Sequence, residues 1–362
     1  MSGRIAVALS GGVDSAAAAM LLDEKGWTVE AVHLRLWPKT EDDPALQAEE
    51  DAESVAKSLG IPFHLVDLTP EFQSRVIETF ICEYLRGRTP NPCVICNPRI
   101  KLGRLLEWAM EKGYDGLATG HYAEIARNEM TDRWELRKGL DPDKDQSYYL
   151  HRLSQDQLAR FHTPLAKMHK GDIRKYVADA GLDLHEKSES QEICFIPDND
   201  YRRFLEERSD ARELPQAGPI LDMDGKELGR HPGIHHFTIG QRRGIGLSAP
   251  EPLYVVALDV EREAVIVGSK EDLLASELEA DEVVWSSMEP TSEAFRGRVK
   301  VRYRSPALPA TIYPAADAAS MRIVFDEVLR AITPGQSAVV YDMDDTKVLC
   351  GGFISVNPVM TK

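Results

Sequence analysis

The chain has 362 residues, of which 43% are hydrophobic and 28% are charged, and its net charge is −16. This length exceeds one ordinary hydrophobic core, so we expect two or three domains of a globular, soluble protein. No apolar run approaches the ~18 residues of a membrane-spanning helix, and a strand that begins almost at Met1 predicts no leader sequence. The acidic balance, taken alone, argues against a nucleic-acid partner.

The cysteines are few and odd in number. They are Cys82, Cys93, Cys96, Cys194 and Cys350. Such usage predicts a reducing, cytoplasmic setting, in which neighbouring thiols serve as metal ligands or in redox chemistry rather than as structural disulfides. Cys82 falls on a predicted helix with apolar neighbours, where we expect a buried core thiol.

Short apolar strands alternate with helical stretches over the first 120 residues. Strands are predicted at residues 5–9, 28–37, 61–68 and 116–119, and helices at 16–22, 45–59, 70–86 and 100–112. This alternation predicts a parallel, doubly wound sheet, whose ligands bind at the carboxyl ends of the strands. We therefore expect residues 10–15, 34–37 and 120–121 to converge.

The first of these loops is Ser10-Gly11-Gly12-Val13-Asp14-Ser15. A strand, a glycine turn and a helix N-terminus together form a cradle for anions, because backbone N–H groups and the helix dipole face the ligand. The loop lacks the Gly-Lys-Ser/Thr ending of a Walker A motif and the spacing of a dinucleotide fingerprint. It is similar to the pyrophosphate loop of ATP pyrophosphatases, S-G-G-x-D-S, which implies ATP cleavage with AMP transfer to a carbonyl oxygen.

The loop at residues 86–99 contains three prolines, three arginines and a C-x-x-C pair. We expect the next helix to begin near Pro98, which places Cys96 close to a helix N-terminus, with Arg99 and Lys101 nearby. Both features would lower the pKa of the Cys96 thiol. A single C-x-x-C makes a poor structural zinc site.

The pattern changes along the second half of the chain. A hairpin is predicted at 124–138, helices at 155–161 and 171–180, and a polar loop bounded by proline around Cys194. Past residue 205, short alternating segments separated by Gly, Pro and Asp predict two small barrel-like β-rich modules. The predicted domains are residues 1–204, 205–274 and 275–362.

Basic residues occupy every second position of residues 296–304, at Arg296, Arg298, Lys300, Arg302 and Arg304. A strand would place all five on one face, which predicts a phosphate-binding stripe on an otherwise acidic protein. Residues 241–244 and 201–203 could extend this stripe. The alternative is an ordinary solvated strand face.

Taken together, these motifs resemble the bacterial tRNA-specific 2-thiouridylases of the pyrophosphate-loop ATPase superfamily, over nearly the whole chain. The residues that carry the resemblance are Ser10 to Ser15, Thr89-Pro90-Asn91-Pro92, Cys96-Asn97, Ala118-Thr119-Gly120-His121-Tyr122, Lys144-Asp145-Gln146-Ser147-Tyr148, Gly240-Gln241-Arg242 and Thr333-Pro334-Gly335-Gln336-Ser337-Ala338. The resemblance implies that ATP and Mg²⁺ activate O2 of the wobble uridine of tRNAs for Lys, Glu and Gln. It also implies a persulfide donor, supplied by a cysteine desulfurase and its relay proteins.

The resemblance further implies roles for individual residues. Cys194 would carry the persulfide and Cys96 would be its partner, either freeing sulfide or closing a disulfide. The implied ATP site consists of Ala8, Leu9, Ser10, Gly11, Gly12, Val13, Asp14, Ser15, Leu34 and Gly120. The implied contacts with the target base or the tRNA are Asn91, Pro92, Cys93, His121, Lys144, Asp145, Gln146, Tyr303, Arg304 and Gln336.

Cys93 departs from the family pattern, because many members carry aspartate at this position. Three cysteines, Cys93, Cys96 and Cys194, could instead hold a [4Fe–4S] cluster through three ligands. Two rival functions stay open at this point. One is a pyrophosphate-loop ATPase that uses ammonia, and the other is a non-catalytic tRNA-binding or nucleotide-sensing protein.

Overall fold

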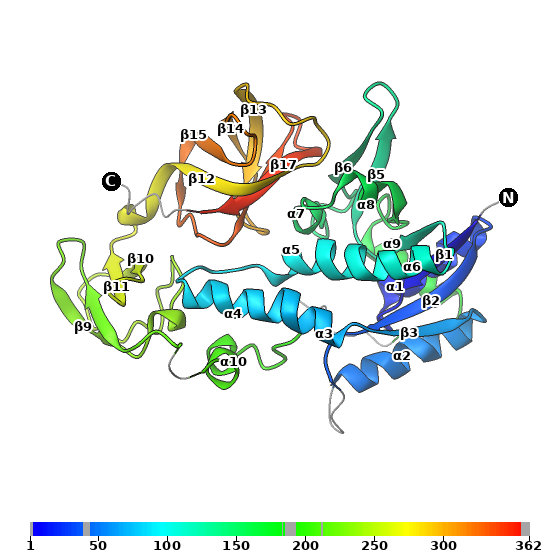
Figure 1. Cartoon of the computed structure of the whole chain (residues 1–362), viewed down its shortest axis with the longest axis horizontal. Coiled ribbons are helices and arrows are strands. Elements are labelled where there is room, and N and C mark those ends of the chain that lie inside the picture. Colours follow the sequence, from blue (N-terminus) through cyan, green and yellow to red (C-terminus); the bar gives the residue numbers. More distant parts are fainter. Residues whose placement is uncertain (1–2, 39–43, 183, 185–192, 211–212, 356–362) are drawn as a thin grey trace.

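The computed structural model describes residues 3–38, 44–182, 184, 193–210 and 213–355. Three parts follow one another along the chain (Figure 1): an α/β part with a parallel sheet, a small central β module and a C-terminal β-barrel. The predicted fold class is confirmed. Among the described helices, none is both long enough and apolar enough to cross a membrane.

The parallel sheet has the strand order β3-β2-β1-β4-β7. Its strands are β1 (Arg4–Ala8), β2 (Thr28–Arg35), β3 (Phe63–Asp67), β4 (Gly116–Ala118) and β7 (Phe161–His162). Because β2 and β3 extend one way from β1 while β4 and β7 extend the other way, the strand order reverses between β1 and β4. Ligands of doubly wound sheets bind beside this reversal, so the loops after β1 and β4 are the expected site.

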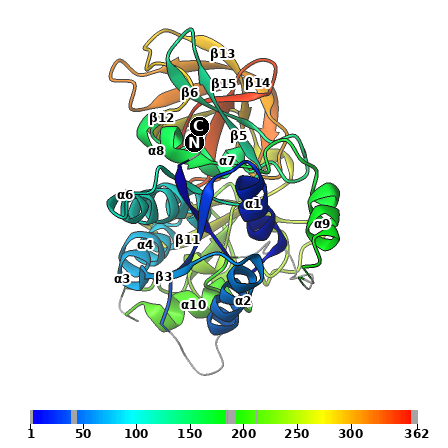
Figure 2. The ribbon, with the colours of Figure 1, turned by 90° about the vertical axis from the view of Figure 1, so that its right-hand side faces the viewer.

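Helices cover both faces of this sheet (Figure 2). One face carries α1 (Val13–Glu24), α2 (Pro44–Leu59) and α9 (Lys170–Asp179), and the other carries α3 (Thr69–Phe72), η1 (Gln73–Ile77), α4 (Glu78–Leu85), α5 (Pro92–Cys96), η2 (Asn97–Leu105) and α6 (Leu106–Glu111). Successive residues of a strand point to opposite faces. Accordingly, Ile5 and Val7 pack toward α1, whereas Ala6 packs toward the second group of helices.

Cys82 corrects one prediction. It lies on α4, in the continuous helical run α3–η1–α4, but its side chain is exposed. The apolar spacing of this run was interpreted correctly, since Phe80 and Tyr84 are buried, yet Cys82 falls on the opposite face of the helix. A thiol is therefore not buried merely because its helix is amphipathic.

The central module has the strand order β10-β11-β8-β9. Its elements are β8 (Gly218–Leu221), β9 (Glu227–His231), η3 (Ile234–His236), β10 (Tyr254–Asp259) and β11 (Ala264–Gly268), and it is preceded by α10 (Tyr201–Arg208). Alternating apolar residues at 253–259 and 264–268 predict two of these strands, and β10 and β11 confirm them. The sequence did not predict helix α10 or strands β8 and β9, because each is short and follows glycine, proline or acidic residues that resemble loop sequence.

The C-terminal strands follow the order β12-β15-β14-β13-β16-β17, and pairing of β12 with β17 closes them into a barrel. They are β12 (Leu274–Trp285), β13 (Phe295–Lys300), β14 (Leu308–Pro314), β15 (Met321–Arg330), β16 (Ser337–Tyr341) and β17 (Lys347–Ile354), with η4 (Glu271–Leu273) leading into them. Each of the six strands therefore pairs with two neighbours in the barrel, which removes free strand edges, and β17 also pairs with a strand outside the barrel.

That further pairing comes from the α/β part of the chain. The predicted hairpin is present as β5 (Ala123–Asn128) and β6 (Arg133–Lys138), and β6 pairs with β17, so that Leu136 lies opposite Val348. The short helices α7 (Ser147–Leu150) and α8 (Gln155–Arg160) follow this hairpin. The hairpin therefore joins the barrel sheet although more than 100 residues of chain separate them.

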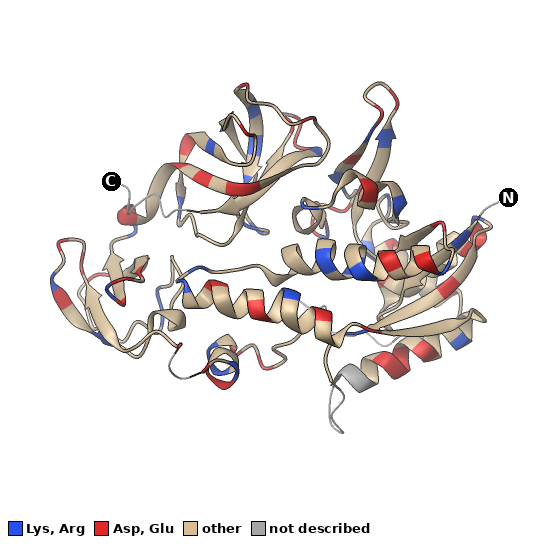
Figure 3. Ribbon diagram, in the orientation of Figure 1, with Lys and Arg blue, Asp and Glu red and all other residues tan. Residues whose placement is uncertain are grey.

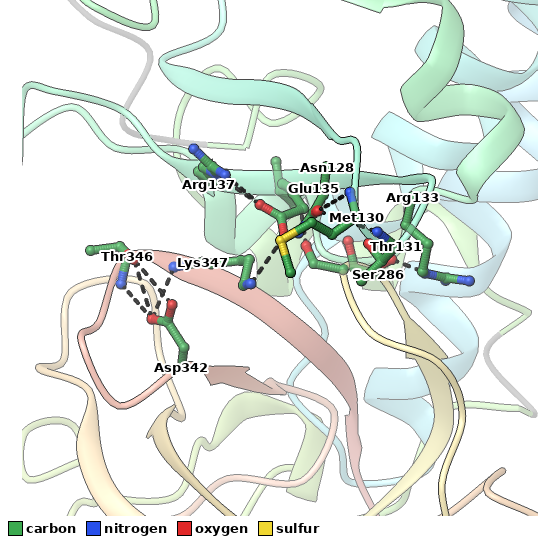
Figure 4. Close-up of polar contacts among 12 residues, drawn as sticks. Asn128, Met130, Thr131, Arg133, Glu135, Arg137, Ser286, Asp342, Thr346 and Lys347 are labelled. Atoms are coloured by element: carbon green, nitrogen blue, oxygen red, sulfur yellow. Dashed lines mark hydrogen bonds and ion pairs between the residues drawn. The ribbon is translucent and has the colours of Figure 1, made fainter.

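Glu135 ties this junction together (Figure 4). Its buried carboxylate accepts hydrogen bonds from Asn128 Nδ2 (2.9 Å), Arg137 Nε (2.9 Å) and Lys347 Nζ (3.0 Å). Burial alone would raise the pKa of this carboxyl group, but these hydrogen bonds outweigh burial and lower it from 4.5 to about 2. The charged form of Glu135 therefore stabilises the folded state.

We expect Glu135→Gln to lower the free energy of unfolding at pH 7 by about 2 kcal/mol, because two cations lose their shared partner. Since the folded pKa is depressed, this stabilisation is present above pH 4.5 and is lost as the pH falls toward 2. The difference between variant and wild type should therefore shrink between pH 5 and pH 3 in urea unfolding. Glu129→Gln, an exposed position of the same hairpin, is the charge-matched control and should change little.

Candidate active site

The loop at residues 10–15 connects β1 to α1. Gly11 has φ +73°, a conformation that favours glycine, and a Cβ there would lie 2.6 Å from Asp51 Cβ on α2. The Ser15 hydroxyl accepts from Ser10 N (3.1 Å) and donates to Gly12 O (3.0 Å). These contacts hold the turn closed and leave the N-terminus of α1 at the strand-order reversal, as an anion cradle requires.

Asp14 is the acidic residue of this loop, and it has two partners from distant segments. Lys170 Nζ, at the start of α9, lies 2.6 and 2.7 Å from its two carboxylate oxygens, and the Tyr122 hydroxyl donates to Oδ1 at 2.6 Å. Sequence reasoning missed Lys170, because nothing in its local sequence marks it. Only the fold brings α9 beside α1.

Gly120 lies directly against the loop. A Cβ at this position would be 2.9 Å from the backbone carbon of Asp14 and 3.0 Å from Ser15 N. The expected convergence of the loops after β1 and β4 is therefore confirmed. Leu34 lies partly buried near the end of the adjacent strand β2, while Ala8 and Leu9 end β1.

His121 follows Gly120 and is buried. Its Nδ1 lies 2.6 Å from Thr119 Oγ1. Burial, followed by the nearby Lys101, lowers the pKa of His121 to about 3. The ring is therefore uncharged at neutral pH, so it offers a hydrogen bond rather than a positive charge to any ligand.

The helix bearing the C-x-x-C pair begins at Pro92, not near Pro98 as predicted. Asn91 caps it, since its side chain accepts from Cys93 N (3.2 Å), and Pro92 occupies the first turn, where no N–H is needed. The helix then runs through Pro98 into η2 and α6 without a break. Cys96 is consequently a full turn away from the helix N-terminus.

The prediction that Cys96 is a stabilised thiolate is therefore wrong for this state of the protein. Burial raises the pKa of Cys96 to about 12. Neighbouring protein atoms also displace water from Cys194 and Cys93, which raises the pKa of Cys194 to about 11 and that of Cys93, although both residues are partly exposed at the surface. Lys101 opposes burial at all three thiols, as its proximity to Cys96 in the sequence suggested, but its effect is smaller. The thiols are protonated at neutral pH.

Electrostatic coupling shows that these thiols are neighbours. Cys96 interacts with both Cys93 and Cys194, and Cys194 interacts with Cys93. All five cysteines are free, so the structure contains no disulfide among them. Lys101 interacts with the three thiols and with His121, which adjoins Gly120. Lys101 therefore acts both on the cysteine cluster and on the residue that follows Gly120, which packs against residues 10–15.

Cys194 is exposed, and the residue after it anchors its loop. Phe195 packs edge-on against Phe72 (5.7 Å between ring centroids) and Phe80 (5.3 Å), and it also contacts Phe204 of α10. This aromatic cluster fixes residues 193–196 against α3 and α4. The segment 185–192, which includes predicted loop residues before Cys194, lies outside the described residues.

The five-residue basic stripe is a second wrong prediction. Strand β13 ends at Lys300, because residues 301–305 form a turn that Ser305 closes by hydrogen bonding to Arg302. Arg302 instead donates to Ala331 O and Thr333 Oγ1, each at 2.6 Å, and Arg296 is paired with Asp326. Figure 3 shows that the barrel carries acidic residues on β12 as well as basic residues on β13.

Several residues predicted to contact tRNA serve the fold in this structure. Asp145 is buried and accepts from Gly139 N and Ser147, and Gln146 Oε1 accepts from Tyr122 N (3.0 Å). Gln336 Nε2 donates to Thr89 O (2.7 Å), which attaches the barrel to the loop before Asn91. Pro92 is buried, and Lys144 is partly buried. Their contacts with tRNA stay predictions.

Tyr303 and Arg304 lie in the turn at residues 301–305, where the barrel meets α7. The Tyr303 ring packs against Tyr149, with 4.4 Å between centroids, and Lys300 lies over its face at 5.3 Å. Arg304 is exposed at the end of this turn. The barrel thereby reaches α7 through an aromatic contact rather than through a basic ribbon.

Protein-family models match all three parts of the chain. The tRNA methyl transferase HUP domain matches residues 3–198, the tRNA methyl transferase PRC-barrel domain matches 202–269 and the aminomethyltransferase beta-barrel domain matches 275–354. Among solved structures, the U34-tRNA thiolase NcsA from Methanococcus maripaludis with its [4Fe-4S] cluster covers 58% of this chain and 67% of its own, at 20% identity and a TM-score of 0.35.

Curated relatives match over nearly their full lengths. The tRNA-specific 2-thiouridylase MnmA of Geobacter metallireducens is 47% identical over 362 residues, covering 97% of this chain and 96% of the relative. That of Halothermothrix orenii is 44% identical over 358 residues, covering 97% and 98%. These matches agree with the three-part fold, with the loop at residues 10–15 and with the cluster of Cys93, Cys96 and Cys194. The chain belongs to the tRNA-specific 2-thiouridylase family.

Proposed function

We propose that this protein replaces O2 of the wobble uridine with sulfur in tRNAs for Lys, Glu and Gln, in the cytoplasm. The observation that carries the proposal is that Gly120 packs against Asp14 and Ser15, while Lys101 acts electrostatically on the next residue, His121, and on the thiols of Cys93, Cys96 and Cys194. The site therefore combines an ATP-cleaving half with a sulfur-handling half. The family relationship supplies the tRNA substrate class.

The first half-reaction activates the base. The C2 carbonyl of uridine is a poor electrophile, and its oxygen is a poor leaving group. Uridine O2 attacks the α-phosphorus of ATP, the bond to the β,γ-pyrophosphate breaks, and an O2-adenylated uridine forms. Residues 10–15 hold the departing pyrophosphate at the N-terminus of α1. The Asp14 carboxylate is about one-third exposed at this turn, so it would hold Mg²⁺, which prefers a carboxylate together with phosphate oxygens and would supply charge neutralisation there.

The second half-reaction delivers sulfur. A persulfide donor from a cysteine desulfurase or relay system loads Cys194, which is the exposed member of the pair. The Cys96 thiolate attacks the Cys194 sulfur, which releases hydrosulfide and closes a transient Cys96–Cys194 disulfide. Hydrosulfide then attacks C2, and AMP leaves with the former O2. Alternatively, the persulfide attacks C2 itself before Cys96 resolves it.

The protonated thiols fit this sequence of events. Burial keeps Cys96 in its thiol form, so the pair does not react with solvent before substrate arrives. Lys101 is the group that favours thiolate there. Binding of the tRNA, with the target base flipped out toward Asn91, Pro92 and Cys93, would place the activated C2 atom near this pair. Lys144, Gln146, Tyr303, Arg304 and Gln336 would contact the tRNA around it.

A second candidate route is favoured by Cys93. Three interacting thiols suit an iron–sulfur cluster better than two thiols together with the aspartate carboxylate that many family members carry at position 93. The three sulfur atoms do not all lie within 4.8 Å of one another, as the ligands of a single ion would. Cys93, Cys96 and Cys194 would hold a [4Fe–4S] cluster that keeps one iron free of protein ligands. Iron and acid-labile sulfide analysis after anaerobic purification distinguishes the two routes, since a colourless, fully active protein contradicts the cluster.

The domain boundaries proposed from the sequence are residues 1–204, 205–274 and 275–362. The family models end and begin close to these positions. The hairpin β5–β6 shows, however, that the barrel sheet draws one piece from the first domain.

The experiment that tests the function supplies tRNA for Lys, ATP, Mg²⁺ and a persulfide-generating cysteine desulfurase with cysteine. We expect one 2-thiouridine per tRNA by mass spectrometry, with stoichiometric AMP and pyrophosphate. Incorporation of nitrogen from ammonia in place of sulfur would identify the rival synthetase. Absence of tRNA-dependent pyrophosphate release would identify a non-catalytic binding protein.

Lys170 gives a sharper test of the phosphate loop. Its ammonium neutralises Asp14, and it would be free to contact the phosphates of ATP if Asp14 held Mg²⁺. We expect Lys170→Met to reduce tRNA-dependent pyrophosphate release by a factor on the order of 100, as for the loss of one fixed charge at a phosphoryl-transfer site. Lys175→Met, an exposed position on the same helix, is the control. Wild-type kinetics in Lys170→Met would contradict this role.

A further inference from the structure

A group of metal-ligating side chains lies away from the active site, where α10 meets the central module. Ligand atoms of Glu206, His235 and His236 all lie within 4.8 Å of one another. Among the residues that the structure describes, it is the one group of three or more His, Cys, Asp or Glu side chains whose ligand atoms lie this close together. Glu206 comes from α10, and both histidines come from η3.

His235 is the member of the group that a purely structural role leaves unexplained. Its side chain is buried, with 3% of the residue exposed, yet neither ring nitrogen has a hydrogen-bond partner. Buried polar atoms are nearly always paired, since leaving them unpaired costs free energy. Gly233 makes the space for this ring, because a Cβ there would lie 2.4 Å from His235 Cε1. The chain therefore accommodates an imidazole that bonds to nothing in the protein.

His236 and Glu206 form the second part of the group. His236 Nε2 lies 3.2 Å from Glu206 Oε1, while Tyr201 and Arg202 donate hydrogen bonds to the His236 backbone oxygen. Two tetrahedral ligands that are each about 2 Å from a zinc ion lie roughly 3.3 Å apart. The observed pair is an ion pair in the structure, and its separation also suits two ligands that share one ion. The rings of His235 and His236 are adjacent, with centroids 4.3 Å apart.

We propose that Glu206, His235 and His236 form a site for a divalent transition-metal ion of the zinc class, with water as the fourth ligand. Two imidazoles and one carboxylate are a donor set that zinc accepts and that magnesium or calcium does not favour. The ion would give the unpartnered His235 nitrogen a bond. It would also clamp α10 to η3.

The clamp has a structural consequence near the sulfur half of the active site. Helix α10 also carries Phe204, whose ring packs 5.3 Å from Phe195, the residue after Cys194. An ion that fixes α10 would therefore steady the support of the Cys194 loop. The three proposed ligands lie on α10 and η3, outside residues 10–15 and the cysteine cluster, so metal binding does not depend on the proposed reaction.

The test uses the full-length chain, both wild type and with Cys93, Cys96 and Cys194 replaced by serine, so that thiols do not compete for metal. Co²⁺ is titrated and followed by its visible absorption, and Zn²⁺ is then added as competitor. We expect one equivalent of Co²⁺ in the serine variant, without sulfur-to-cobalt charge transfer, and displacement by Zn²⁺. Zn²⁺ should also raise the unfolding temperature.

Glu206→Gln and His236→Gln remove one ligand each from the more exposed part of the site, so they should fold even if a change at His235 does not. Each should weaken Co²⁺ binding at least tenfold. Glu207→Gln is the matched control, because Glu207 is exposed on the same helix and pairs with Arg203; it should bind as the parent does. No bound equivalent, or equal affinity in Glu206→Gln, overturns the proposal.

Discussion

Replacement of Cys194 by serine should reduce 2-thiouridine formation by a factor on the order of 1,000, because a serine hydroxyl forms no persulfide. The first equivalent of pyrophosphate released with tRNA and ATP should form at a rate within about threefold of wild type, because adenylation precedes sulfur delivery and uses the other half of the site. The measurement is paired: thiolated nucleoside by mass spectrometry and pyrophosphate by a coupled assay, on the same reactions.

Two further variants are needed to interpret this result. Cys82→Ser removes an exposed thiol on α4 outside the cluster, so it should leave both activities unchanged. Cys96→Ser should resemble Cys194→Ser in thiolation if Cys96 resolves the persulfide. Thiolation above a tenth of the wild-type rate in Cys194→Ser would contradict the proposed sulfur carrier.

Cys93→Asp restores the side chain that many family members carry, and it separates the two sulfur routes. If the persulfide route operates, the aspartate variant keeps activity. If a cluster is required, the variant loses iron and thiolation together, because two thiolates replace three. Iron content measured on each preparation decides between these outcomes.

Gly120→Ala should lower the affinity for ATP by a factor on the order of 100, since a displaced phosphate-binding backbone loses several aligned N–H groups. The added Cβ would lie 2.9 Å from the Asp14 backbone carbon and 3.0 Å from Ser15 N, so the loop or the strand end must shift. Overpacking of this kind also lowers stability, typically by about 1–3 kcal/mol. ATP titration and thermal unfolding measure the two effects.

The control for this variant is Gly171→Ala. Gly171 lies in α9 with nothing within 4 Å of an added Cβ, so alanine there should preserve ATP affinity and add up to about 1 kcal/mol of stability through helix propensity. An unchanged Michaelis constant for ATP in Gly120→Ala would remove residue 120 from the nucleotide site.

Four strands of the parallel sheet were predictable, because a short apolar run marks each of β1, β2, β3 and β4. The two-residue strand β7 was not, because Phe161 was assigned to the end of the predicted helix 155–161. The convergence of residues 10–15 with Gly120 followed from topology alone. Lys170 was not predictable, because its partner Asp14 lies 156 residues away and no local pattern encodes that pairing. Long-range partners of this kind arise only when the helices pack.

The errors also have physical causes. The proline at position 98 suggested a helix start, but a better start, Asn91 followed by Pro92, lay six residues earlier and was treated as loop. Burial then reversed the expected direction of the Cys96 pKa. The alternating basic residues at 296–304 suggested one long strand, whereas a turn at 301–305 directs Arg302 toward the Ala331 carbonyl oxygen and the Thr333 hydroxyl. Periodicity describes a strand only as far as the strand continues.

The pairing of β6 with β17 means that sequence domains and cooperative folding units differ in this protein. A fragment that begins at residue 275 would lack the hairpin that covers β17 and supplies Glu135 to Lys347, and it would expose a strand edge to other chains. Conversely, a fragment that ends at residue 204 would keep a hairpin without its sheet. The α/β part and the C-terminal barrel thus share one sheet, and we expect these two parts to unfold in a single transition.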